Sequence, residues 1–159
     1  MKLDFRSSLH KILDQQRGIR VPESGEKFKL KPGERRDIAV LFLDLDGFTA
    51  LSEKLDHESV HEIAKSIMDA LVDVTEDYEG YVDKIEGDRI MVLFGARKAG
   101  ENDSIRAISC AFRMLDAIRT ASSILSETGI PITASIGINS GPVTVAPDAI
   151  GHLTAMGKT

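Results

Sequence analysis

A run of six apolar residues, Ile38 to Leu43, constrains the fold of this chain more than any other feature. A short run of this kind, rich in β-branched and aliphatic side chains, is typical of a buried β-strand. The strand predicted over 38–44 ends at Asp44, so this carboxylate is held rigidly at the edge of a sheet. The turn at Asp46-Gly47 that follows is predicted to open a helix.

A long helix and a hairpin are predicted next. Apolar residues recur at helical spacing over 60–74, and charged residues occupy the opposite face. Gly80 is predicted to end this helix. Two strands, 81–86 and 89–94, are predicted to pair around the turn-forming dipeptide Gly87-Asp88.

A third helix is predicted to begin at the capping residues 102–103 and to end before Gly129. A strand over 132–138 then leads to a predicted turn at 139–142, and a further short strand begins at Val143. The apolar residues of the third helix keep helical spacing: Ile105, Ile108, Phe112, Leu115, Ile118 and Leu125.

The element order β-α-α-β-β-α-β predicts an α+β fold, an α/β sandwich with a mostly antiparallel sheet. A chain of 159 residues is long enough for one domain with an appendage. We therefore divide it into an N-terminal helical arm and linker, 1–35, and one domain, 36–159. The short amphipathic helix of the arm either packs on its own domain, the simpler interpretation, or serves dimerisation or regulation.

Composition excludes several classes of protein. A net charge of −5 argues against a nucleic-acid surface, because phosphate binding needs clustered Lys and Arg. No apolar stretch approaches the roughly 18 residues that suggest a membrane span, and the first residues lack a signal-peptide core. The single cysteine, Cys110, is expected to be a buried, inert thiol, which favours a reduced, cytoplasmic compartment.

Two motifs surround the aspartates at positions 44 and 88. The segment 41–53, with Asp44-Leu45-Asp46-Gly47-Phe48-Thr49 at its centre, resembles the first signature of the class III nucleotide cyclases, the adenylate and guanylate cyclases. The segment Lys84-Ile85-Glu86-Gly87-Asp88, followed by 91–95, resembles the second. The resemblance covers 36–159 and implies a ferredoxin-like sandwich that is incomplete at its C-terminus.

The resemblance implies conversion of ATP to 3′,5′-cyclic AMP and pyrophosphate. Such a reaction uses two Mg²⁺ or Mn²⁺ ions, which bind hard oxygen ligands. Asp44 and Asp88 are the candidate catalytic residues and metal ligands, and the family adds the main-chain carbonyl of Leu45. Taken singly, Asp44 is equally well a solvated strand-end carboxylate and Asp88 a turn former, so the pair in its two contexts carries the interpretation.

Substrate contacts are also implied. Gly47, Phe48 and Thr49 lie where a strand turns into a helix, a position where unpaired backbone N–H groups suit a triphosphate. In the family, residues at the positions of Lys84 and Thr154 read adenine across the interface of a homodimer, so each site is composite. Lys84 with Thr154 points to ATP, because GTP-using relatives typically show Glu and Cys there.

The resemblance fails after Gly157. The family usually continues with Gly-Asp and then with an Asn and an Arg that stabilise charge at the α-phosphate, whereas Lys158 replaces the Asp here and the sequence stops at Thr159. Losing that stabilisation commonly costs orders of magnitude in rate. The expectation is that this chain alone is inactive.

Two other functions remain as alternatives. A non-catalytic cyclase-like module that binds nucleotide or dimerises would keep Asp44, Asp88 and Lys84 without needing the Asn and Arg. A diguanylate cyclase has a similar first metal-binding strand. Its hairpin has the sequence Gly-Gly-Asp/Glu-Glu-Phe, whereas residues 86–90 of this chain are Glu-Gly-Asp-Arg-Ile.

Two further motifs are interpreted as accidental. His57-Glu58-Ser59-Val60-His61 has the spacing of zinc proteases, but its histidines lie beside the polar face of an ordinary amphipathic helix. Gly157-Lys158-Thr159 is similar to the end of a phosphate-binding loop, but the preceding glycine stands one residue too far away and no helix follows.

Overall fold

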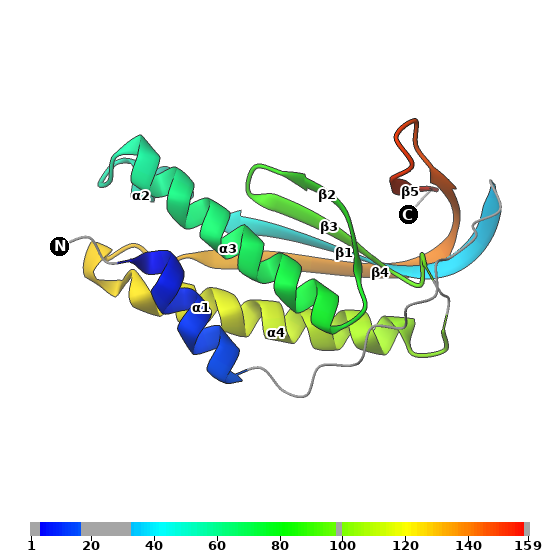
Figure 1. The fold of residues 1–159 in the computed structure, drawn as a ribbon, viewed down its shortest axis with the longest axis horizontal. Helices are drawn as coiled ribbons and strands as arrows, with labels where there is room; N and C mark the ends of the chain where they lie inside the picture. Colours follow the sequence, from blue (N-terminus) through cyan, green and yellow to red (C-terminus); the bar gives the residue numbers. More distant parts are fainter. Residues whose placement is uncertain (1–3, 17–32, 98–99, 158–159) are drawn as a thin grey trace.

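The computed structural model describes residues 4–16, 33–97 and 100–157, and in these ranges one antiparallel sheet packs against helices (Figure 1). The strands are ordered β2-β3-β1-β4-β5, and every neighbouring pair is antiparallel. The predicted α+β sandwich with an antiparallel sheet is confirmed. The strands are β1 (Glu34–Asp46), β2 (Tyr81–Glu86), β3 (Arg89–Phe94), β4 (Thr133–Pro147) and β5 (Leu153–Met156). The helices are α1 (Phe5–Gln16), α2 (Phe48–Ser52), α3 (His57–Asp77) and α4 (Asp103–Ile124), with a 3-10 turn η1 (Ser126–Thr128).

Strand β1 is the centre of the sheet. It pairs with β3 over 39–44 and with β4 over 34–46, so the predicted strand 38–44 is the part with neighbours on both sides. Leu41 and Leu43 are buried against the helices, whereas Phe42, between them, is 52% exposed. This alternation defines the open face of the sheet, the face away from the helices, which carries Phe42 and Asp44.

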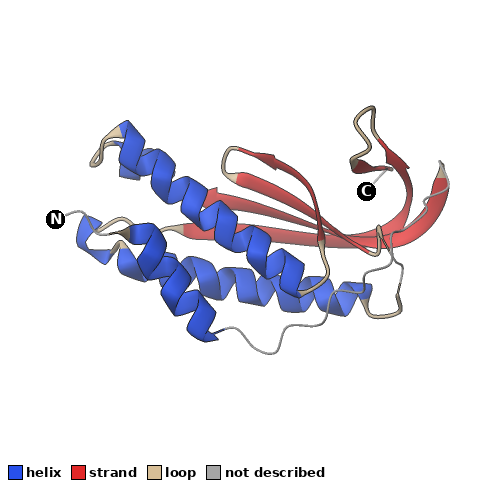
Figure 2. Ribbon diagram, in the orientation of Figure 1, coloured by secondary structure: helices blue, strands red, loops and turns tan. Residues whose placement is uncertain are grey.

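Two apolar clusters flank the sheet. The larger lies between the sheet and the helices, which Figure 2 shows gathered against the strands. Helix α1 belongs to it: Phe5 and Leu9 are buried, and the helix contacts α3 and α4. The smaller cluster lies on the open face beneath β5. Its buried residues are Ile38, Val40, Leu93, Ala96, Val143, Val145 and Leu153.

The N-terminal arm is described in part. Its helix packs as the simpler interpretation expects, while Gly18, Pro22, Gly25 and Pro32 of the expected linker lie outside the described residues. A domain boundary at residue 35 stays a prediction.

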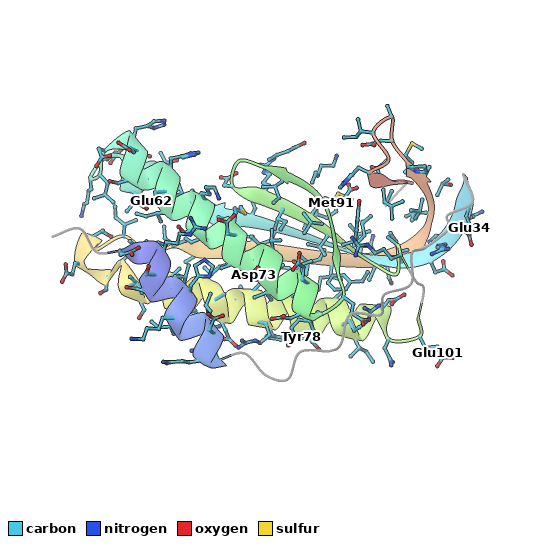
Figure 3. The ribbon with its side chains drawn as sticks, viewed as in Figure 1. Glu34, Glu62, Asp73, Tyr78, Met91 and Glu101 are labelled. Carbon is cyan, nitrogen blue, oxygen red and sulfur yellow. The ribbon has the colours of Figure 1, made fainter. Side chains whose placement is uncertain are left out.

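The apolar face predicted for α3 is buried, but the end of the helix differs from the prediction. The residue with left-handed backbone is Glu79, at φ 57°, and not Gly80. Arg106 of α4 holds this turn, because its guanidinium donates to the carbonyl of Tyr78, at the end of α3 (Figure 3), and to the Glu79 carboxylate at 3.2 Å. Gly80 is needed for another reason: a Cβ there would lie 2.8 Å from the Thr75 side chain.

Helix α4 buries a face of small residues, and the predicted apolar stripe is partly wrong. Ile105, Ile108 and Phe112 are between 48% and 66% exposed. Small side chains let the helix axis approach the sheet closely, so the larger residues are turned outward. No helix in the described ranges combines the length and hydropathy that crossing a bilayer requires. The buried face of α4 comprises Ala107, Cys110, Ala111, Met114, Ala117, Ile118 and Ala121.

The turn predicted at 139–142 is wrong, because β4 continues unbroken through it. Pro142 lies opposite Asp37 of β1. A proline is tolerated in a strand where its missing N–H faces away from a partner. Strand β5 pairs with β4 only from Thr144 onward, so the other side of Pro142 meets no strand in the described part of the chain.

Candidate functional site

Asp44 and Asp88 lie at the same edge of the sheet. Asp44 is opposite Arg89 in the register of β1 and β3, one residue beyond the turn that holds Asp88. The N–H of Leu45 donates to the Asp88 carbonyl at 2.9 Å, which ties the turn directly to β1. The backbone therefore brings the two predicted metal ligands together.

The electrostatic surroundings of Asp44 leave it available to a cation. Its Oδ2 accepts from Nε of Arg89 at 3.2 Å, and the two side chains are 44% and 69% exposed. Ion pairs this exposed contribute about 0–1 kcal/mol, so Arg89 holds the carboxylate weakly. Asp88 is exposed in its turn.

The donor atoms at this edge fit a hard divalent cation. Because the N–H and C=O of one strand residue point to the same side, the Leu45 carbonyl faces the Asp88 turn along with its N–H. Two carboxylates and a carbonyl are oxygen ligands of the kind that Mg²⁺ and Mn²⁺ prefer. Within the described ranges, no three acidic, His or Cys side chains converge into a ready-made metal cluster.

The residues expected to hold phosphates form a tight loop. Gly47 has φ 110° and precedes α2, and no side chain caps that helix. A Cβ at Gly47 would lie 2.5 Å from the Pro131 carbonyl oxygen, so only glycine fits. Phe48 packs against the larger core and Thr49 is exposed. Their contact with a triphosphate stays a prediction.

Lys84 and Thr154, the predicted base-reading residues, come from strands at opposite ends of the sheet order, yet these strands meet. Figure 1 shows β5 beside the end of the sheet where β1 begins, and β5 contacts β2. Leu153 anchors it in the smaller cluster. One chain thus brings together the strands that carry both residues.

A β-bulge determines which way Lys84 points. Val82 is paired with Val92 and Lys84 with Met91, so Asp83 is an extra residue without a partner on β3. Val82 packs on the larger core, whereas Met91, labelled in Figure 3, packs on the smaller. The bulge therefore places Asp83 and Lys84 on the same open face.

A chain of hydrogen bonds fastens β5 to β2. The N–H of Leu153 donates to the Tyr81 hydroxyl oxygen at 2.9 Å, and that hydroxyl lies 2.9 Å from Nδ1 of His152. Nε2 of His152 lies 2.6 Å from the Asp83 carbonyl oxygen. A carbonyl only accepts, so Nε2 carries a proton; in the neutral ring Nδ1 then accepts from Tyr81.

Asp83 is a buried acid that sequence reasoning missed. Its side chain is 2% exposed, with Oδ1 4.0 Å from Nε2 of His152. Neither carboxyl oxygen has a hydrogen-bond partner within the described residues. Burial raises the pKa of Asp83, while the charges of Lys84 and His152 and the hydroxyl of Thr154 oppose the rise. The only sequence signal was an acid immediately before Lys84.

The structure describes the remaining candidate motifs in part. His57 and His61 are exposed on the first turns of α3, and no group of three potential metal ligands includes them within the described ranges. Cys110 is fully buried, and burial raises the pKa of its thiol to about 12, as expected for an inert cysteine. Lys158 and Thr159 lie outside the described residues.

Comparison with known proteins adds independent information. The sequence matches the adenylate and guanylate cyclase catalytic domain family over residues 30–154. The cytidylate cyclase of Staphylococcus aureus is 29% identical over 111 residues, which make up 68% of this chain and 26% of that protein. The chain spans about a quarter of the length of the first curated relatives it matches.

Solved cyclase structures have the same fold. The adenylyl cyclase CyaB from P. aeruginosa superimposes with a TM-score of 0.74 at 27% identity, covering 80% of this chain and 69% of that one. The guanylyl cyclase Cya2 gives a TM-score of 0.70 at 34% identity, covering 80% and 66%. With the family match covering most of its length, this chain belongs to the adenylate and guanylate cyclase catalytic domain family.

Proposed function

We propose that the protein is the catalytic domain of an adenylate cyclase, which converts ATP to 3′,5′-cyclic AMP and pyrophosphate. The observation that carries this proposal is the pairing of Asp44 with the Asp88 turn at one sheet edge, with Lys84 on the open face of the same sheet and Thr154 on the strand that meets β2. Membership of the cyclase family supports the reaction type; the choice of base rests on these side chains.

Asp44, Asp88 and the Leu45 carbonyl would hold two Mg²⁺ or Mn²⁺ ions. When bound, such ions lower the pKa of the attacking ribose hydroxyl and neutralise charge on the phosphates. The protein contributes rigidity, because Asp44 lies on a strand with hydrogen-bonded neighbours on both sides. Gly47 lets the start of α2 lie close to Pro131, just before β4, and the backbone of Phe48 and Thr49 would meet the triphosphate there.

Lys84 and Thr154 would read the base. An ammonium only donates, so Lys84 suits the ring nitrogen acceptors of adenine, and a hydroxyl both donates and accepts. Similar proteins include a cytidylate cyclase and a guanylyl cyclase, so the choice of nucleotide is argued from these two side chains. ATP is the substrate that this pair of side chains favours.

The proposed active site is composite. In a two-fold homodimer, Asp44 and Asp88 of one subunit would face Lys84 and Thr154 of the other. The exposed Phe42, at 52%, lies on the same open face as these residues and supplies apolar surface for such an interface. Cytoplasmic location is proposed from the lone, buried Cys110.

Product analysis tests the proposal. The natural full-length protein is incubated with ATP, GTP, CTP and UTP separately, with Mg²⁺ or Mn²⁺, and the products are separated by chromatography. Cyclic AMP from ATP as the main product is expected. Cyclic dinucleotide from GTP, or a different preferred nucleotide, would contradict the assignment. Nucleotide binding without turnover would favour the non-catalytic alternative.

A further inference from the structure

The buried carboxyl of Asp83 requires an explanation that the proposed metal and phosphate sites do not supply. A buried acid without a hydrogen bond costs free energy, and such groups in folded proteins commonly have a functional role. At 2% exposure its side chain cannot be solvated, and neither oxygen has a donor at ordinary hydrogen-bond distance and angle among the described residues, although the Thr154 hydroxyl lies close enough to lower its pKa. It lies next to Lys84 and faces the strand that carries Thr154.

The neighbouring donors can be counted. The Tyr81 hydroxyl and both ring nitrogens of His152 are committed to the chain that joins Leu153 to the Asp83 carbonyl. Among the described residues, two further side-chain donors influence the carboxyl, the ammonium of Lys84 and the hydroxyl of Thr154. Both lower the pKa of Asp83, so both lie within its electrostatic reach. Lys84 lies on the same open face as Asp83, but its side chain is exposed and it acts through its charge, whereas the half-buried Thr154 acts through a hydrogen bond from its hydroxyl.

We propose that Asp83 is a specificity-determining residue that acts through Thr154 to select nucleotides whose base carries an exocyclic amino group. A threonine hydroxyl alone does not discriminate, because it donates to a carbonyl as readily as it accepts from an amino group. An ionised carboxylate only accepts. When the Thr154 hydroxyl donates its proton to Asp83, the hydroxyl oxygen can contact the base only as a hydrogen-bond acceptor.

The consequence is a choice of substrate class. Adenine and cytosine present an amino group at the Watson–Crick edge, whereas guanine and uracil present a carbonyl at the equivalent position. An oxygen that can only accept hydrogen bonds attracts the bases with an amino group and repels the bases with a carbonyl. A site with fixed polarity discriminates against a mismatched partner because a buried polar group is left unpaired.

The clamp formed by Tyr81 and His152 makes this arrangement rigid. It fixes β5 against the bulge of β2 through bonds on both sides of the imidazole, so Thr154, two residues beyond His152, is held at a set distance from Asp83. Leu153 packs in the smaller cluster and prevents β5 from sliding. Asp83 is thus a positioning residue and does not touch the nucleotide itself.

Affinities of ATP, CTP, GTP and UTP for this chain, measured by isothermal titration calorimetry with Ca²⁺ as a non-catalytic cation, test the inference. Asp83→Asn is expected to lower the preference for ATP over GTP by about five- to tenfold, the effect of one hydrogen bond. Asparagine keeps the shape but can donate to Thr154, so GTP should bind as well or better. Glu127→Gln, an exposed carboxylate on η1, is the charge-matched control and should change nothing.

A double-mutant cycle separates this role from a merely structural one. In Thr154→Val, which keeps the shape and removes the hydroxyl, Asp83→Asn should have no further effect on the ratio of affinities. Additive effects, or equal weakening of all four nucleotides, would overturn the inference while leaving the proposed function intact. Since the inference rests on that function, absence of nucleotide binding by the unmodified chain would count against both. Thermal unfolding verifies that each variant is folded.

Discussion

The two ends of the open face are built in different ways. At the end proposed to bind metal ions, called the metal end, Asp88 is exposed and Asp44 is half exposed, and both are positioned by the backbone of adjacent strands. One weak ion pair, between Asp44 and Arg89, joins side chains there. At the base end, Asp83 and His152 are held by side-chain hydrogen bonds between strands that are far apart in the sheet order. Chemistry at the first end should therefore be separable from folding, whereas chemistry at the second should not.

The largest expected effect lies at the metal end. Asp44→Asn in the full-length enzyme should lower metal-dependent turnover by about 10²-fold or more, because an amide is a poor ligand for a hard cation. Its melting temperature should stay within about 2 °C of the unmodified protein, since the side chain is half exposed. Initial rates and thermal unfolding measure the two quantities. Loss of folding would contradict the separation of the two ends.

Leu153→Ala tests the base end by removing the anchor of β5. The side chain is 9% exposed within the smaller cluster, so truncation should cost about 2–4 kcal/mol of unfolding free energy. Chemical denaturation measures it. Ile150→Ala, in the neighbouring loop and 89% exposed, is the matched control and should be close to neutral. A neutral Leu153→Ala would mean that β5 is not packed on the sheet.

The pH dependence of stability should distinguish the ends further. The pKa of Asp83 is raised above its ordinary 3.8, chiefly by burial, with Lys84, His152 and Thr154 opposing and Asp148 reinforcing the rise. A raised folded-state pKa means that the stabilising contribution is complete below 3.8 and is lost as pH rises through the folded value.

Asp83→Asn removes that titration. Its unfolding free energy relative to the unmodified protein should increase as pH rises from about 3.8 and level off above the raised pKa. Urea denaturation at a series of pH values measures the difference. Asp44→Asn provides the comparison at the metal end. If the difference in unfolding free energy between Asp83→Asn and the unmodified protein stayed constant across this pH series, Asp83 would have the same pKa in the folded and unfolded states.

The smallest effect is expected at Arg89. Its guanidinium shares the Asp44 carboxylate with any incoming cation, so Arg89→Ala should tighten Mn²⁺ binding by a few-fold at most, the value of an exposed ion pair. Electron paramagnetic resonance titration of free Mn²⁺ measures it. Weaker Mn²⁺ binding in the variant would show that Arg89 helps to shape the site.

The relative placement of Asp44 and Asp88 could be predicted from the sequence because it depends on local rules. An apolar run fixed β1, and the turn residues Gly87-Asp88 fixed the hairpin, so the closeness of Asp44 and the Asp88 turn followed from antiparallel pairing. The buried face of α3 could also be predicted, because large apolar residues recur on it at helical spacing.

Errors arose where long-range packing overrode local preference. The sequence Asn139-Ser140-Gly141-Pro142 favours a turn, but thirteen paired residues of β1 hold β4 straight through it. Alanines on α4 gave no periodic signal strong enough to outweigh its exposed Ile105 and Phe112. Asp83 could not be identified at all, because its burial depends on β5 returning across the sheet, a contact between residues 69 positions apart.

The bulge in β2 has a consequence for changes in chain length. Asp83 has no partner on β3, and the pairs on either side of it, Val82 with Val92 and Lys84 with Met91, would follow each other in a regular ladder if it were removed. Deleting this single residue should therefore leave every other side chain of the strand on its present face. Few positions inside a sheet tolerate a one-residue deletion, and here the deletion would keep the strand register while removing both the carboxylate and the carbonyl that accepts from His152.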